Sequence, residues 1–150
     1  MKKLFVCLVA AIAIFGITGC EKVKTYKEGV YEASVVDPYN NENNVASAKI
    51  TIDSKGKITE VYLDTTYVSN GVETTKKTLK ENYNMKKYNA SAAGEWYEQV
   101  EKLEKAIVEK QGLDFLNLDA DGKTDAVSGC TIKIDALYNA AKAALEKASN

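Results

Sequence analysis

The stretch Ser47-Ala48-Lys49-Ile50-Thr51-Ile52-Asp53, followed by Ser54-Lys55-Gly56-Lys57, decides the fold. Its apolar residues alternate with polar ones, which is typical of a strand with one buried face. The next four residues are turn formers, and the alternation resumes from Ile58 to Val68. The two runs therefore predict a β-hairpin. A further strand is expected at 30–36, separated from the hairpin by a loop at 38–44.

Helical patterns dominate the second half of the chain. From Glu95 to Gln111 the apolar residues recur at helical spacing, and Gly112 stands where helices commonly end. A second helix with an alanine-rich stripe is expected from Thr131 to Lys147, and a loop at 114–124. The segment 73–84 is polar and ambiguous. Because the strands precede the helices, we predict one α+β domain, with a mostly antiparallel sheet packed with two main helices.

The N-terminus has the pattern of a bacterial lipoprotein signal peptide. Met1-Lys2-Lys3 supplies positive charge, and Leu4 to Ile17 is an apolar run too short to span a bilayer comfortably. The run ends in Ile17-Thr18-Gly19-Cys20, which fits the lipobox. We therefore expect cleavage before Cys20 and acylation of its thiol, by palmitate for example. An uncleaved anchor or a plain secretory signal is the alternative.

Cleavage would divide the chain into a signal peptide (1–19), a lipidated cysteine with its polar tether (20–27) and a domain (28–150). The mature chain is long enough for a single core. Lipidation would place it at the extracytoplasmic face of the cell membrane. A further hypothesis is that a short apolar peptide from 13–19 is itself a released product.

The composition excludes several kinds of chemistry. The net charge is −1, and it falls to −3 when Lys2 and Lys3 leave with the signal peptide, which argues against a nucleic-acid partner. The chain has no histidine, which excludes nucleophile–histidine pairs and most transition-metal sites. It also lacks arginine, so a phosphate would be held by backbone N–H groups, hydroxyls and lysines. These limits favour a reaction carried by a cofactor.

No metal site is expected. The acidic stretch from Asp119 to Asp125 is similar to a calcium loop, but Gly122 stands at its fourth position instead of the sixth. The stretch is therefore expected to be an ordinary turn-rich loop.

The chemically most specific stretch is Asp125-Ala126-Val127-Ser128-Gly129-Cys130-Thr131. One interpretation is an ordinary helix start, with Ser128 or Thr131 as the N-cap and Gly129 at a positive φ. The other is a phosphate site, because hydroxyls and unpartnered N–H groups at a helix N-terminus suit an anion. Cys130 is expected to be a small buried residue, with a reactive thiol as the alternative.

This stretch resembles the flavin-attachment motif of the FMN-binding domain family, Asp-x-x-Ser/Thr-Gly-Ala-Thr/Ser. The resemblance implies that FMN is joined to Thr131 by a phosphoester bond, which a separate flavin transferase makes from FAD. It implies that Ser128 and Gly129 shape the turn and contact the phosphate, and that the transferase reads Asp125. Cys130 replaces the usual alanine and is only slightly larger, so the turn should persist.

Three residues outside the motif are candidate flavin neighbours: Met85, Tyr88 and Trp96. An isoalloxazine ring needs apolar or aromatic faces, but Trp96 also begins the helical apolar stripe, so core packing is the stronger interpretation for it. Lys133 is placed to neutralise a phosphate, although a solvated lysine is the simpler interpretation.

The resemblance implies a carrier of electrons more than a substrate-specific enzyme. Its implied donors are a membrane quinone pool or a membrane NADH dehydrogenase relay. Its implied acceptors are extracellular, such as ferric iron, quinones or a partner reductase. The alternative is a flavin-free binding lipoprotein or surface antigen on the same fold.

Overall fold

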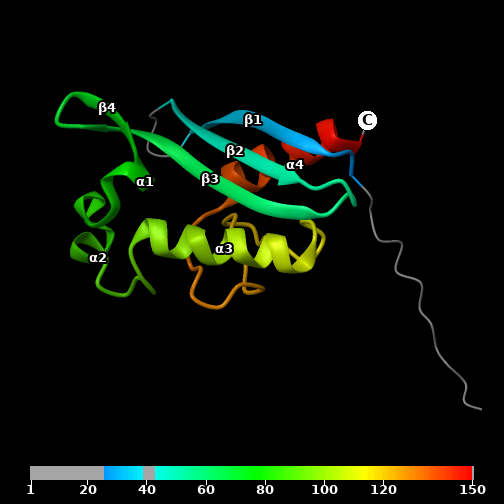
Figure 1. The fold of residues 1–150 in the computed structure, drawn as a ribbon. Helices are drawn as coiled ribbons and strands as arrows, with labels where there is room; N and C mark the ends of the chain where they lie inside the picture. The colour runs from blue at the N-terminus through cyan, green and yellow to red at the C-terminus, as the bar shows by residue number, and fades with distance from the viewer. Residues whose placement is uncertain (1–25, 39–42, 150) are drawn as a thin grey trace, which may run out of the picture.

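The computed structural model describes residues 26–38 and 43–149. The predicted signal peptide, Cys20 and most of the predicted tether lie outside these residues, as does much of the loop predicted at 38–44. In the described part, an antiparallel sheet comes first and two long helices follow, so the α+β prediction is confirmed (Figure 1). The sheet is a meander in chain order: β1 (Gly29–Asp37), β2 (Asn44–Ile52), β3 (Ile58–Ser69) and β4 (Val72–Thr75).

The predicted hairpin is β2 and β3. Along β2 every second side chain is buried, namely Ala46, Ala48, Ile50 and Ile52. The turn between the strands is held by Asp53, whose carboxylate accepts hydrogen bonds from the N–H groups of Lys55 and Lys57, both at 2.9 Å. Gly56 takes the positive φ of 73° that this turn requires. Local turn chemistry therefore fixes the register of the sheet.

Helix α3 (Trp96–Lys110) runs along the outer edge of β3 (Figure 1). Its start is fixed by a capping box between Glu95 and Glu98. Gln111, just past the helix, accepts a hydrogen bond from the N–H of Ile58 at 2.9 Å and donates one to its C=O at 2.8 Å. The α3 region thus satisfies backbone groups that an uncovered strand edge would leave open.

Helix α4 (Asp135–Ser149) lies against β1 and β2. Its packed face is made of small residues, of which Ala140, Ala141, Ala144 and Ala148 are fully buried. Lys147 donates a hydrogen bond to the C=O of Glu32 on β1. The alanine stripe therefore lets the helix axis approach the sheet closely.

The predicted start of this helix at Thr131 is wrong. From Thr131 to Ile134 exposed and buried residues alternate, as in an extended chain. The N–H of Ile134 donates to the C=O of Gly122 at 2.7 Å, and this tertiary bond holds the chain straight before the helix. Neither Ser128 nor Thr131 is the N-cap.

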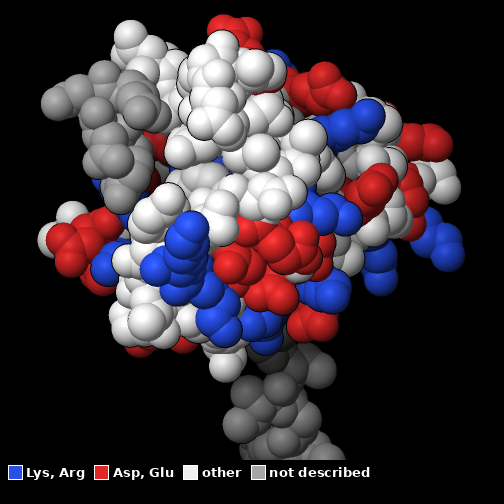
Figure 2. Space-filling view, turned by 90° about the vertical axis from the view of Figure 1, so that its left-hand side faces the viewer, with Lys and Arg blue, Asp and Glu red and all other residues white. Residues whose placement is uncertain are grey.

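The ambiguous segment 73–84 contains most of β4, the single turn α1 (Lys76–Leu79) and a 3₁₀ turn, η2 (Lys80–Tyr83). The short α2 (Met85–Tyr88) follows. These pieces pack beside β3 and the start of α3 at one end of the molecule. On the face at that end, a central acidic group has lysines beside and below it, and the area directly above it is mostly uncharged (Figure 2).

The packed domain begins slightly before the predicted boundary at residue 28. Tyr26 is 7% exposed and belongs to the core, and the N–H of Lys27 donates to the C=O of Ala148 at 2.9 Å. Tyr26 and Lys27, which the sequence assigns to the tether, therefore contact the domain. Among the described residues no helix has the length and apolar character needed to cross a membrane.

Candidate functional site

The motif 125–131 forms a tight turn anchored by two buried side chains. The N–H of Cys130 donates to the C=O of Val127 at 3.1 Å, and Gly129, third in this turn, has a φ of 77°. A positive φ at that position is what a type II turn needs. Val127 and Cys130 point into the core, whereas Ser128 is exposed. The turn therefore presents Ser128 and the residues after Cys130 at the surface.

Thr131 is held by a residue of α3. Its N–H donates to Gln99 Oε1 at 2.8 Å, and its hydroxyl donates to the same oxygen at 3.1 Å. Gln99 is completely buried, and its Nε2 donates to the C=O of Gly94 at 2.8 Å. The amide of Gln99 is thus oriented by Gly94 and presents its oxygen to Thr131. The Thr131 residue itself is exposed.

Thr131 lines a cavity of about 330 Å³. Buried or half-buried groups of separate elements line it too: Thr65 of β3, Lys76 of α1, Tyr83 of η2 and Trp96 of α3. The chain after the motif completes the wall with residues 132, 133 and 135–137, so the first turn of α4 still borders this space. A volume of this order is within the range of small-molecule sites.

The cavity is lined by charges of both signs, since Asp37, Asp121 and Asp135 border it together with Lys76, Lys123 and Lys133. The ammonium of Lys76 lies 5.4 Å from the ring centroid of Tyr83 and 5.3 Å from that of Trp96. Lys133 is exposed and forms an ion pair with Asp135 at 3.1 Å. The deep aromatic part and the outer part near Thr131 therefore each carry a lysine.

Two of three comparisons place the chain among known proteins. The model of the FMN-binding domain family matches residues 43–146. This chain belongs to the FMN-binding domain family. A protein from Clostridium thermocellum, solved by solution NMR, is 32% identical; the match covers 83% of this chain and 93% of that one, with a TM-score of 0.55. The search of curated proteins found no match.

The cavity beside Thr131 suits the cofactor of an FMN-binding domain. It offers aromatic rings for a flat ring system, a hydroxyl for a phosphoester and lysines for negative charge. It does so without arginine, as the composition requires.

The predicted site residues of this FMN-binding domain do not all reach the cavity. Thr131 and Trp96 line it, whereas Asp125, Ser128, Gly129 and Cys130 do not. Met85 lies behind the site, with its sulfur 3.6 Å from Gln99 Nε2, and Tyr88 is 81% exposed and does not line the cavity. Trp96 is 4% exposed, so it serves both the core and the cavity wall.

Sequence reasoning missed three residues of this site: Gln99, Lys76 and Tyr83. One signal was available for Gln99, because it falls three residues after Trp96 and four before Leu103, within the apolar stripe of α3. A glutamine on a buried helix face must find hydrogen-bond partners. Lys76 and Tyr83 come from the irregular segment after β4, where the apolar residues have no regular spacing.

Cys130 of the FMN-binding domain is a packing residue. It is 2% exposed, and burial raises the pKa of its thiol to about 11. The prediction of a small buried residue is therefore confirmed. The thiol is kept protonated at neutral pH.

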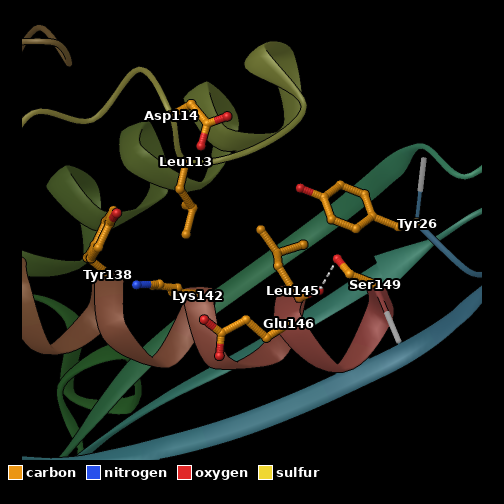
Figure 3. A pocket seen from close by; sticks show the side chains of 8 residues that line it. All are labelled: Tyr26, Leu113, Asp114, Tyr138, Lys142, Leu145, Glu146 and Ser149. Carbon is orange, nitrogen blue, oxygen red and sulfur yellow. Dashed lines mark hydrogen bonds between the residues drawn. The ribbon is translucent and has the colours of Figure 1, made fainter. Parts of the chain in front are cut away.

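A second, larger cavity of about 500 Å³ lies between α4 and the loop after α3 (Figure 3). Leu113 and Leu145 form its apolar walls, and Lys142 and Glu146 project from α4 beside them. No residue of the motif lines this cavity. Of these two cavities, Thr131 therefore borders only the smaller.

Proposed function

We propose that this protein is a lipid-anchored, extracytoplasmic flavoprotein that carries electrons through FMN attached at Thr131 by a phosphoester bond. The observation that supports it most directly is the position of Thr131. Thr131 is exposed at a cavity lined by Trp96 and Tyr83, and its backbone N–H is hydrogen-bonded to Gln99. The residue is thus accessible to a second protein and adjacent to a cavity of small-molecule size.

The attachment is a group transfer that needs FAD and a flavin transferase. The Thr131 oxygen bonds to the FMN phosphorus, the pyrophosphate bond of FAD breaks, AMP leaves and the hydroxyl proton is lost. Gln99 Oε1 accepts the hydrogen bond of that hydroxyl, which orients the oxygen. Thr131 is a tether in this scheme and takes no part in electron transfer.

The bound cofactor would supply the one- and two-electron chemistry that amino acids lack. The chain's own residues bind and orient it. Trp96 and Tyr83 offer apolar surface to the ring, and Lys133 faces the outer part of the cavity near the attachment point. Asp125 and Ser128 lie outside the cavity, where a transferase can contact them.

Acylation at Cys20 would keep the domain beside the membrane. Tyr26 is packed in the core and five residues separate it from Cys20, which is a reach of about 20 Å when that segment is extended. A domain held this close suits donors in the membrane, such as quinol or an NADH dehydrogenase relay. Its acceptors would be extracellular oxidants or a partner reductase.

Expression of the exported full chain with a flavin transferase tests the attachment. We expect a yellow protein whose mass exceeds that of the acylated polypeptide by one FMN minus one water, and a Thr131→Val variant without that gain. Bound flavin without a mass gain would mean non-covalent binding. A colourless, unmodified chain would favour a flavin-free binding lipoprotein.

A further inference from the structure

Lys76 is a buried cation in the wall of the Thr131 cavity. It is the first residue of α1 and is 6% exposed. Its ammonium lies near the rings of Tyr83 and Trp96, 5.4 and 5.3 Å from their centroids. Tyr83 and Trp96 also contact each other edge to face, with centroids 6.4 Å apart. The three side chains form one unit at the aromatic part of the cavity, which we call the lysine–aromatic wall.

Burying an ammonium group costs free energy, because water is removed from it. Attraction to aromatic faces offsets part of this cost. In a site with little water, such a charge also acts strongly on any ligand that gains negative charge there. The lysine–aromatic wall is therefore suited to a flat aromatic ligand that becomes anionic.

Lys133 offers a contrast within the same cavity. It lies two residues from Thr131, is exposed and forms an ion pair with Asp135 at 3.1 Å. A phosphate esterified to Thr131 would lie at this outer, solvated part. Lys76 is buried beside the two rings, in the part of the cavity where we place the flavin ring system.

We propose that Lys76 stabilises the negative charge of reduced flavin and so raises the reduction potential of this protein. The proposal rests on the proposed function. Two electrons from a donor such as dithionite and one proton convert FMN to its reduced form with one negative charge on the ring. In this proposal Lys76 transfers no proton and acts through its positive charge alone.

Sulfite binding to the flavin-loaded full chain measures this effect without electron transfer. Sulfite donates its electron pair to flavin N5, a sulfur–nitrogen bond forms, and the flavin ring gains the negative charge and loses its yellow colour. We expect Lys76→Met to weaken sulfite binding by roughly tenfold or more, because one nearby positive charge is lost. The reduction potential of the flavin should fall in the same variant.

The controls separate this role from others. Lys142→Met removes an exposed lysine that lines the other cavity and should leave sulfite affinity within about twofold of wild type, since exposed charges are screened. Lys76→Arg keeps the charge and should restore most of the affinity. If the Lys76→Met protein does not fold, Lys76→Gln is used in its place to remove the charge.

Three outcomes are decisive. Equal sulfite affinity in the Lys76→Met and Lys142→Met proteins would overturn this proposal while leaving the proposed function standing. Folded Lys76 variants that lose flavin altogether while Lys142→Met retains it would also overturn it, because Lys76 would then act in attachment. A wild-type chain without flavin would overturn both proposals.

Discussion

Gln99 accepts two hydrogen bonds from Thr131, one from its N–H at 2.8 Å and one from its hydroxyl at 3.1 Å, although 32 residues separate them. The amide nitrogen of Gln99 is occupied by the C=O of Gly94 at 2.8 Å. An amide used at both ends has one orientation. The position of Thr131 therefore depends on a residue in the core of α3.

Replacement of Gln99 tests this dependence. Gln99→Leu leaves the N–H of Thr131 without its partner and should lower the free energy of unfolding by about 1–3 kcal/mol. It should also reduce the fraction of chains that carry flavin, because the acceptor hydroxyl is no longer oriented. Urea denaturation and intact mass measure the two effects.

Gln111→Leu is the matched control for this substitution. Gln111 makes the same kinds of hydrogen bonds to the backbone of Ile58, far along α3 from Thr131. It should cost similar stability but leave flavin occupancy unchanged. Equal loss of flavin in both variants would show that stability alone governs attachment.

Gly129→Ala tests the turn that precedes Thr131. The φ of 77° costs an alanine about 1–2 kcal/mol, so we expect that loss of stability together with lower flavin occupancy. Gly71, in the β3–β4 turn, has a φ of 78° and open space around it. Gly71→Ala should destabilise to a similar extent and retain flavin, as judged by thermal unfolding and absorbance. Full occupancy in the Gly129→Ala protein would contradict the role of the turn.

The sequence predicts the elements that are determined by local patterns of residues. The period of two in β2 and the Asp53 turn give the hairpin, and the spacing of Trp96, Val100 and Leu103 gives α3. The predicted start of α4 at Thr131 is wrong, because the hydrogen bond from the N–H of Ile134 to the C=O of Gly122 keeps the preceding residues extended. Helix propensity alone gives no sign of this tertiary hydrogen bond.

The candidate site likewise has one part that the sequence predicts and another part that it does not. The motif singles out Thr131, but the wall of its cavity comes from elements that tertiary packing brings together. Lys76 and Tyr83 follow β4 in a segment without a regular period, and no spacing relates them to Thr131. Sequence therefore predicts the attachment point and not the surroundings of the ring.

The Cys130 thiol should resist alkylation in the folded chain. Burial raises its pKa to about 11, so at pH 8 almost no thiolate forms and reagents do not reach it. Iodoacetamide should label Cys130 of the acylated protein only after denaturation. A Ser128→Cys variant, exposed on the same turn, should be labelled at once. Rapid labelling of native Cys130 would mean that the turn opens.

The raised pKa of Glu104 predicts how the free energy of unfolding depends on pH. Burial raises the pKa of this carboxyl above its usual value, against the opposing effects of Lys77 and the N–H of Leu63. Around and between the unfolded and the folded pKa, the folded state then binds more protons at Glu104 than the unfolded state does. This contribution to stability is complete below the unfolded pKa and is lost as the pH rises through the folded one.

The measurement compares wild type with Glu104→Gln, which cannot titrate at that position. The free energy of unfolding of wild type minus that of the variant should increase as the pH is lowered from 7 to 5. A difference that shrinks over this range would indicate a depressed carboxyl instead, held by its ion pair with Lys77.

The central claim is that Thr131, and no other hydroxyl, carries the flavin. Trypsin should release residues 124–133, which contain three hydroxyl residues, namely Thr124, Ser128 and Thr131. Fragmentation of this peptide from the flavin-loaded protein gives the position of the added mass. The account predicts the whole addition on Thr131. An addition on Ser128, or a peptide that remains unmodified in a transferase-containing cell, would contradict it.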